Sequence, residues 1–214
     1  MNCIVTAGPT YEPLDDVRRL TNFSTGRLGI EFANFLVARG HHVTLLIGEM
    51  STYTGERKAQ AVAPFTTTAD LRGKLKALSE RPFDAIFHVA AVSDFAFGRL
   101  LDPESHQPVP ATKKIPTRRG RLLVELTPTP KIIAELRDWF PKAKITGWKY
   151  EADGQRADAI AAGRRQLTDN ATDACVVNGP AYGDGFALVA KAGEPAHFAI
   201  PSELFRSLEN ICHR

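Results

Sequence analysis

A glycine- and hydroxyl-rich segment near the start of the chain has the residue types that bind phosphate. An apolar run, Asn2 to Ala7, ends at Gly8-Pro9, and Asn-Phe-Ser-Thr-Gly-Arg-Leu-Gly follows at residues 22–29, where a helical pattern begins. Backbone N–H groups and hydroxyls at a helix start can hold a phosphate. The candidate ligands are Gly8, Ser24, Thr25 and Gly26, with charge from Arg18 and Arg27. The alternative is a simple helix cap at Ser24 or Thr25 and a tight turn at Gly26.

Three further strand ends carry polar or aromatic side chains. Ala91 and Asp94 stand in Ala-Ala-Val-Ser-Asp-Phe, where small residues let a ligand approach the backbone and a carboxylate can bind a metal ion or a ribose hydroxyl. Trp148 can stack on a nucleobase, and Asn178 can read a base edge with its paired donor and acceptor. The alternatives are structural: a turn residue, a helix cap or a core aromatic.

A basic segment, Lys113-Lys114-Ile115-Pro116-Thr117-Arg118-Arg119, lies inside a stretch that contains four prolines, residues 92–121. The prolines predict a long functional loop without regular structure. Lysine supplies a mobile point charge that suits a triphosphate, whereas a solvated run of surface charge is the alternative.

The elements that must position these residues alternate along the chain. Apolar, β-branched runs predict strands, and apolar residues at helical spacing predict helices. The expected strands are Asn2–Ala7, His42–Ile47, Phe83–Ala91, Leu122–Leu126, Lys144–Trp148, Ala174–Val177, Phe186–Ala190 and His197–Ile200. The expected helices are Leu28–Ala38, Thr68–Leu78, Lys131–Trp139, Arg156–Leu167 and Ser202–Ile211.

This order predicts an α/β fold, a Rossmann-like, mostly parallel sheet with helices on both faces and a small antiparallel edge. The sequence shows no repeat or linker, so we expect one domain over residues 1–214. Ligands of such sheets bind beyond the carboxyl ends of the strands. The candidate loops therefore share one edge of the sheet.

The composition narrows the class of protein. A net charge of +3 is too small to indicate nucleic-acid binding. The cysteines Cys3, Cys175 and Cys212 are odd in number and far apart, which argues against a disulfide framework or a zinc site; Cys3 and Cys175 fit buried strand positions. No apolar run approaches the ~18–20 residues that cross a bilayer, and no signal peptide is evident, so we expect a cytoplasmic protein without a membrane partner.

Taken together, these stretches resemble the phosphopantothenate–cysteine ligase family, the ligase domain of the DNA/pantothenate metabolism flavoproteins. The resemblance covers about residues 2–180. Its most specific segment is TAGPTYEPLDDVRRLTNFSTGRLG at residues 6–29. It continues with AAVSDF at 90–95, KI at 114–115, WFPKAKITGWKYEAD at 139–153 and VVN at 176–178.

The resemblance implies a two-step ligation in coenzyme A biosynthesis. The carboxylate of 4′-phosphopantothenate attacks the α-phosphate of a nucleoside triphosphate, and the amine of cysteine then displaces the nucleoside monophosphate. Mg²⁺ would accompany CTP or ATP. The residues present suit this chemistry, because charge that builds on phosphate oxygens needs cations and fixed N–H donors.

Site roles follow from the resemblance residue by residue. Asn22 matches the asparagine that handles the acyl-nucleotide and the incoming cysteine, Arg18 a basic residue that positions the acyl substrate, and Lys114 the loop lysine that pairs with the triphosphate. The substrate- or nucleotide-binding set is Gly8, Ser24, Thr25, Gly26, Ala91, Asp94, Trp148 and Asn178, and no residue is assigned as a metal ligand.

The sequence also departs from the family pattern. The basic loop resembles that of eukaryotic members, which have a single lysine, rather than the bacterial Lys-x-Lys-Lys pattern. Both CTP and ATP therefore remain candidates for the nucleotide. Lys113 and Lys114 both remain candidates for the active lysine. Trp148 replaces the usual Phe, and Gly179 replaces the usual acidic residue after Asn178. We expect no FMN and a separate decarboxylase partner, because the chain begins directly at the first ligase strand. The resemblance also implies a homodimer.

Two other functions compete with the ligase. A nicotinamide oxidoreductase would carry Gly-x-Gly-x-x-Gly and usually a Tyr-x-x-x-Lys pair, and neither is present. A non-catalytic nucleotide-binding or regulatory subunit with the same fold is the second alternative, which the altered lysine loop keeps open.

Overall fold

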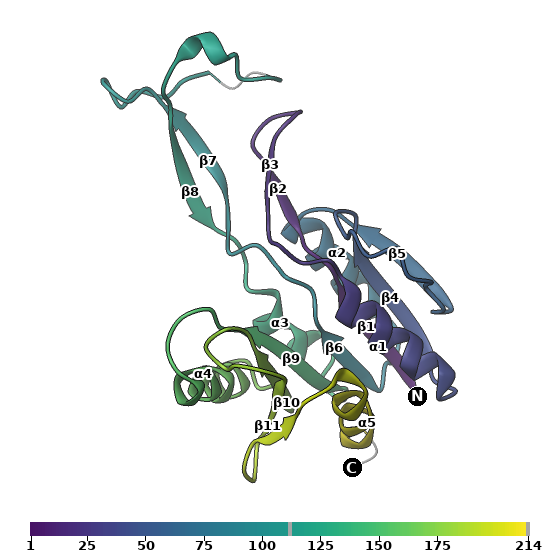
Figure 1. Cartoon of the computed structure of the whole chain (residues 1–214). Coiled ribbons are helices and arrows are strands. Elements are labelled where there is room, and N and C mark those ends of the chain that lie inside the picture. Colours follow the sequence, from purple (N-terminus) through teal and green to yellow (C-terminus); the bar gives the residue numbers. More distant parts are fainter. Residues whose placement is uncertain (111–112, 213–214) are drawn as a thin grey trace.

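The computed structural model describes residues 1–110 and 113–212 and is built on an eight-stranded sheet (Figure 1). Its strands, in spatial order, are β12 (Ala196–Phe198), β11 (Phe186–Ala190), β10 (Ala174–Asn178), β9 (Lys144–Tyr150), β6 (Ala85–His88), β1 (Asn2–Ala7), β4 (His42–Gly48) and β5 (Ala61–Phe65). The six strands from β10 to β5 run parallel, whereas β11 pairs antiparallel with both β10 and β12. The predicted fold class and its antiparallel edge are confirmed.

Helices cover both faces of this sheet. The helices α1 (Arg27–Ala38) and α5 (Pro201–Ile211) pack on one face, where Phe32, Phe87 and Phe205 form an aromatic cluster. The other face is covered by α2 (Thr68–Leu78), α3 (Ile132–Trp139) and α4 (Arg156–Asp169). Apolar residues on both sides of each central strand explain why these strands read as continuous apolar runs.

Two antiparallel hairpins project from the sheet on the side of its carboxyl edge (Figure 1). One pairs β2 (Tyr11–Pro13) with β3 (Arg19–Thr21), and the other pairs β7 (Phe95–Leu101) with β8 (Leu123–Pro128). The prediction of a loop without regular structure over residues 92–121 was therefore wrong, because β7 and a 3₁₀ turn, η1 (Thr117–Arg119), lie within it. β7 pairs with β8 in a small sheet outside the main one, and its residues do not alternate between buried and exposed, so no periodic pattern marks it in the sequence.

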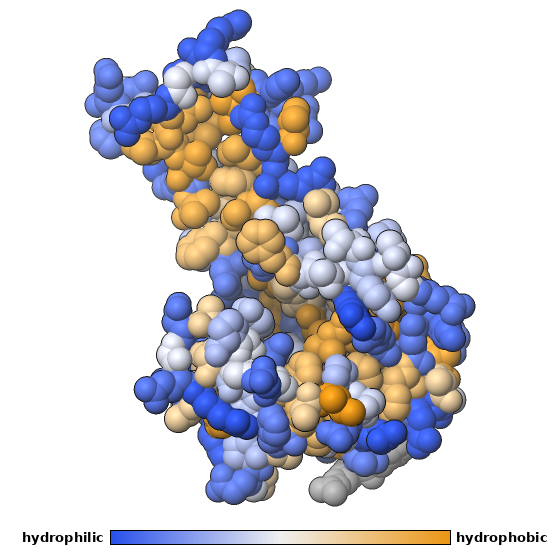
Figure 2. Space-filling view, viewed as in Figure 1, coloured by the Kyte–Doolittle hydropathy of each residue, from blue (hydrophilic) through white to orange (hydrophobic). Residues whose placement is uncertain are grey.

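The hairpins carry exposed apolar side chains (Figure 2). We call these the hairpin apolar residues: Val17, Leu20, Phe23, Phe95, Leu123, Val124 and Leu126. Phe23 is fully exposed, and it follows Asn22 directly. Within residues 1–110 and 113–212, no helix has the length and apolar character needed to span a membrane.

Cys3 and Cys175 are buried, as expected, and all three cysteines are unbonded thiols. Burial raises the pKa of the Cys3 and Cys175 thiols to about 12. Both therefore behave as small core residues rather than nucleophiles.

Candidate functional site

At the carboxyl edge of the sheet, the loop that follows β1 packs against Ser51, a residue that the sequence did not single out. Ser51 Oγ lies 1.9 Å from the position that a Cβ on Gly8 would occupy and 2.8 Å from that of a Cβ on Gly26. Both glycines have positive φ, 78° and 80°. Tyr53 N–H donates to the Thr25 carbonyl at 3.1 Å, which ties the loop after β4 to the start of α1. Glycine is required at both positions because three backbone segments meet there.

The start of α1 is open. Its N-cap is Gly26, which has no side chain to cap it, and its first turn contains no acidic residue. Thr25 Oγ1 accepts from Arg27 N–H at 3.3 Å, while Ser24 makes no side-chain cap. The first-turn N–H groups of a helix have no intrahelical partner and favour an anion. Arg27 adds little free charge, because its guanidinium pairs with Glu31 at 2.7 Å.

Asn22 contacts the segment that follows β6. Its Nδ2 donates to the carbonyl oxygens of Ala91 and Val92, both at 3.2 Å. The Ala91 backbone is itself fixed, since its carbonyl accepts from Thr10 N–H at 3.1 Å and its N–H donates to the Gly8 carbonyl at 3.0 Å. The structure therefore brings Asn22, Ala91 and Gly8 together, although they come from separate segments of the chain.

A buried histidine supports the same strand end. His88 Nδ1 lies 3.0 Å from Thr6 Oγ1, which also accepts from Ala90 N–H at 3.1 Å. Burial lowers the pKa of His88 to about 4. His88 is therefore neutral at physiological pH and braces the backbone beside Ala91.

Asp94 forms an ion pair with a second residue that the sequence did not single out, Lys131, at the start of α3. Both side chains are about two-thirds exposed, at 65% and 68%. Thr129 fixes the backbone there: its N–H donates to the Asp94 carbonyl at 3.0 Å, and its hydroxyl donates to the Ser93 carbonyl. Asp94 is thus an accessible carboxylate with a cation already beside it.

Trp148 and Asn178 lie on neighbouring strands at the same edge and on the same face of the sheet. Among the described residues, Trp148 Nε1 and Asn178 Oδ1 are buried without a hydrogen-bond partner. Buried polar atoms of this kind are rare in folded proteins because each costs free energy. One donor and one acceptor on adjacent strands therefore stand unpaired where a ligand of an α/β sheet binds.

The remaining candidates, Arg18 and Lys114, lie at the tips of the two hairpins. Arg18 Nη2 donates to the Ile115 carbonyl at 2.9 Å, and Ile115 N–H donates to the Asp15 carboxylate at 3.0 Å. From Arg18 to Asn22 the chain follows β3, about 13 Å of extended strand. The structure therefore separates a sheet-edge group, which contains the other candidates, from a hairpin-tip group.

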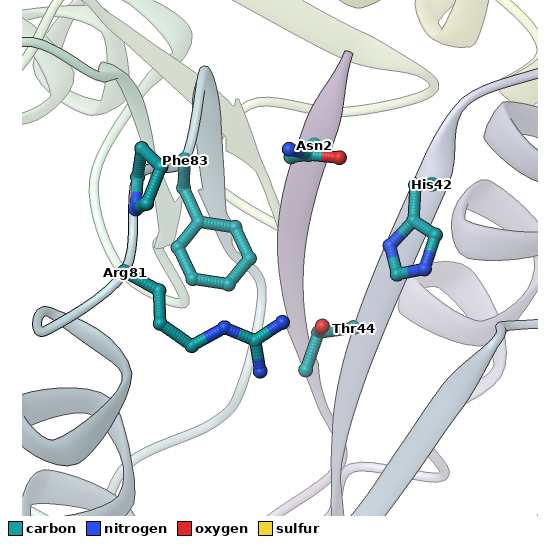
Figure 3. A pocket seen from close by; sticks show the side chains of 6 residues that line it. Asn2, His42, Thr44, Arg81 and Phe83 are labelled. Atoms are coloured by element: carbon teal, nitrogen blue, oxygen red, sulfur yellow. The ribbon is translucent and has the colours of Figure 1, made fainter.

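Two surface cavities lie away from the sheet-edge group, and none of its residues lines them. One of about 310 Å³ lies by the hairpins, lined by Leu14, Gly98, Arg99, Leu100, Pro108 and Val109. Another of about 240 Å³ lies at the amino edge of the sheet, where Arg81 extends toward Thr44 (Figure 3). No group of three His, Cys, Asp or Glu residues that could hold a metal ion occurs in the described parts of the chain.

The sequence did not identify three residues at the sheet edge, namely Ser51, His88 and Lys131. Ser51 stands in a loop without a motif, and its role follows only from contact with glycines far away in sequence. His88 reads as one residue of an apolar run. Lys131 did carry a signal, because a lysine is an unusual residue at a helix N-cap, where Ser, Thr, Asp and Asn are preferred.

Two known proteins are similar to this chain over most of its length. A relative from Thermococcus kodakarensis, the coenzyme A biosynthesis bifunctional protein CoaBC, is 30% identical over 175 residues, 82% of this chain and 40% of that protein. The phosphopantothenate–cysteine ligase of Mus musculus is 28% identical over 205 residues, 70% of this chain and 63% of that protein. The chain thus spans less than half the length of the bifunctional relative.

The fold has a close counterpart among solved structures. The DNA/pantothenate metabolism flavoprotein from Streptococcus pneumoniae superposes with a TM-score of 0.86 at 24% identity, covering 98% of this chain and 97% of that one. Residues 1–192 match the family model described as DNA/pantothenate metabolism flavoprotein C-terminal domain. The chain belongs to this family.

Proposed function

We propose that this chain is a phosphopantothenate–cysteine ligase that acts in coenzyme A biosynthesis through an acyl-nucleotide intermediate. In the first step, a carboxylate oxygen of 4′-phosphopantothenate bonds to the α-phosphorus of a nucleoside triphosphate, and pyrophosphate leaves. In the second, the cysteine nitrogen bonds to the acyl carbon, the carbon–oxygen bond to phosphate breaks, and the nucleoside monophosphate leaves with the electron pair. The amine loses one proton.

The observation that carries this proposal is the position of Asn22 beside the open start of α1. Its amide donates to the Ala91 and Val92 carbonyls, and four residues further along the chain Gly26 begins α1 without a side-chain cap of its own. An acyl-phosphate needs both features: donors for the phosphate oxygens and an amide at the acyl group. Holding the reactants in this geometry contributes much of the rate enhancement.

The nucleotide is CTP or ATP in this proposal, with its base near Trp148 and Asn178. Their unpaired Nε1 and Oδ1 atoms support this placement, since a base offers an acceptor and a donor side by side. Mg²⁺ would be held largely by the triphosphate itself, as is usual for this ion, because the described residues supply no cluster of three ligands. Bound there, it would neutralise charge on the phosphate oxygens.

A homodimer is part of the proposal. Two observations support it: the hairpin apolar residues are exposed (Figure 2), and Arg18 and Lys114 stand apart from Asn22. Apolar strands that project into solvent are typical of surfaces that a partner covers. In a dimer formed through the hairpins, the tip group of one copy would approach the sheet edge of the other.

We also propose that a separate flavin-dependent decarboxylase consumes the product. The ligase reaction leaves the cysteine carboxylate in place, so its removal requires another active site. No role for FMN on this chain enters the proposal.

The test is pyrophosphate release by the purified chain with Mg²⁺, 4′-phosphopantothenate and cysteine, comparing CTP with ATP. Release that depends on phosphopantothenate is expected, and the better nucleotide is identified in the same assay. A folded protein that binds nucleotide but releases no pyrophosphate with either would favour the regulatory alternative.

A further inference from the structure

The ion pair between Asp94 and Lys131 lies on the surface, beside a loop that other contacts already hold. Both side chains are about two-thirds exposed, at 65% and 68%. Exposed pairs of this kind contribute little to folding stability, because water competes for each charge. The backbone of the loop is already fixed by the two hydrogen bonds of Thr129.

Lys131 also works against the helix that it begins. It occupies the N-cap of α3, where its side chain caps no backbone N–H group. A positive charge at this end of a helix is unfavourable because the helix dipole is positive there as well. Local helix stability therefore does not account for Lys131.

The pair stands next to the reacting centre of the proposed ligase. Asn22 binds the Val92 carbonyl, and Asp94 follows Val92 by two residues, which span at most about 7 Å. The Asp94 carboxylate that pairs with the Lys131 ammonium therefore belongs to the same short segment as the Val92 carbonyl that Asn22 contacts.

We propose that Lys131 binds the carboxylate of the incoming cysteine and so selects an amino acid over a simple amine. This inference rests on the proposed function, because it concerns the second step only. Cysteine enters with its carboxylate intact and leaves with it intact, so that group is available for recognition throughout. Asp94 holds the lysine in place when the site is empty and is exchanged for the substrate carboxylate when cysteine binds.

The competing amine that tests this idea is cysteamine, which has the amine and thiol of cysteine but no carboxylate. The measurement is kcat/KM for cysteine and for cysteamine at saturating nucleotide and phosphopantothenate, in the unmodified chain and three variants. Lys131→Gln removes the charge, Lys131→Arg keeps it, and Lys142→Gln is the matched control. Lys142 is an exposed lysine between α3 and β9, at the opposite edge of the sheet.

We expect Lys131→Gln to lower kcat/KM for cysteine about 10-fold, the usual scale of one lost charge-assisted contact, and to leave that for cysteamine within about twofold. Lys131→Arg should retain most of the preference for cysteine, and Lys142→Gln all of it. An unchanged ratio of cysteine to cysteamine in Lys131→Gln would overturn the inference. So would an equal loss for both amines, which indicates a structural role.

The two proposals fail in different ways. If the unmodified chain releases no pyrophosphate, the ligase function itself is wrong. The other case is an unmodified chain that forms the acyl-nucleotide and both amides. If Lys131→Gln then changes neither the ratio of kcat/KM for cysteine to that for cysteamine nor the KM for cysteine, only the role assigned to Lys131 is wrong.

Discussion

The carboxylate of Asp15 accepts a hydrogen bond of 3.0 Å from the backbone N–H of Ile115, one hundred residues further along the chain. This bond is the largest cause that lowers the pKa of Asp15 below its ordinary value. Arg18 completes the contact by donating to the Ile115 carbonyl at 2.9 Å. The lysine segment is thereby docked on the tip of the β2–β3 hairpin.

Replacing Asp15 should release this segment. Asp15→Ala removes the acceptor, so we expect trypsin to cleave after Lys113 or Lys114 several-fold faster than in the unmodified chain. Asp16→Ala is the control, because the hydrogen bond from Asp16 to the Lys113 carbonyl is donated by the backbone N–H and survives the substitution. Equal cleavage rates in the two variants would show that the carboxylate does not hold the segment.

The junction of Gly8 with Ser51 should tolerate no side chain. Gly8→Ala adds a Cβ 1.9 Å from Ser51 Oγ at a φ of 78°, so both overpacking and backbone strain apply, together about 3 kcal/mol. Gly40→Ala isolates the strain, because Gly40 has a φ of 84° and open space around it. The midpoint temperature of thermal unfolding should fall by about 6–12 °C for Gly8→Ala and by about 2–4 °C for Gly40→Ala.

A second change checks the cause. Adding Ser51→Ala to Gly8→Ala removes the clashing oxygen, and the double variant should recover to the level of Gly40→Ala. No recovery would mean that the contact between these two residues is not what makes glycine necessary.

Asn22→Asp should separate the two chemical steps. The new carboxylate would face the Ala91 and Val92 carbonyl oxygens, which accept from Asn22 at 3.2 Å, and acceptor would meet acceptor. We expect pyrophosphate release to persist in part, while amide formation falls about 100-fold, the scale of losing one aligned donor. Asn34→Asp is the control, since Asn34 Nδ2 donates to the Glu56 carbonyl away from the sheet edge. Normal amide yield in Asn22→Asp would contradict the assigned role.

His88 should make folding stability depend on pH. Burial lowers its pKa from 6.5 to about 4, so the unfolded chain binds a proton that the folded chain excludes. The free energy of unfolding keeps its full value above pH 6.5. It decreases as the pH falls toward 4, with a slope of about 1.4 kcal/mol per pH unit. Urea unfolding between these limits measures the slope, and His88→Leu should reduce it by about that amount. Parallel curves for the two proteins would refute this account.

Lys113 and Lys114 should differ in their effect on the triphosphate. We expect Lys114→Gln to raise the KM for the nucleotide about 10-fold, the scale of one charge-assisted contact, and Lys113→Gln to raise it far less. The backbone of Lys113 is held by Asp16, and both side chains are exposed. A reversed order would assign the role to Lys113 instead.

The central strands could be predicted because burial on both faces leaves an unmistakable apolar run. β5 was not predicted, since Pro64 and exposed residues interrupt its pattern at the edge of the sheet. β2 and β3 are three residues each and lie outside the main sheet, so nothing periodic marks them. Where tertiary contacts do not impose a pattern, the sequence carries little trace of the strand.

The candidate site divides in the same way. Asn22, Gly26 and Ala91 stand in contiguous motifs, and the structure brings these motifs together. Ser51 and Lys131 were missed because their partners, Gly8 and Asp94, are distant in sequence and only folding places them side by side. A motif identifies the residues of one loop, whereas a contact between loops is a property of the sheet.

The main sheet is closed to growth at both margins. β5 carries Pro64, which lacks the N–H needed to pair outward, and β12 is only three residues long. Edge strands with these features resist pairing with a further chain, which is a common defence against aggregation. Within the described residues, the main sheet therefore offers a further copy no long edge strand to extend, so self-association by growth of this sheet is disfavoured.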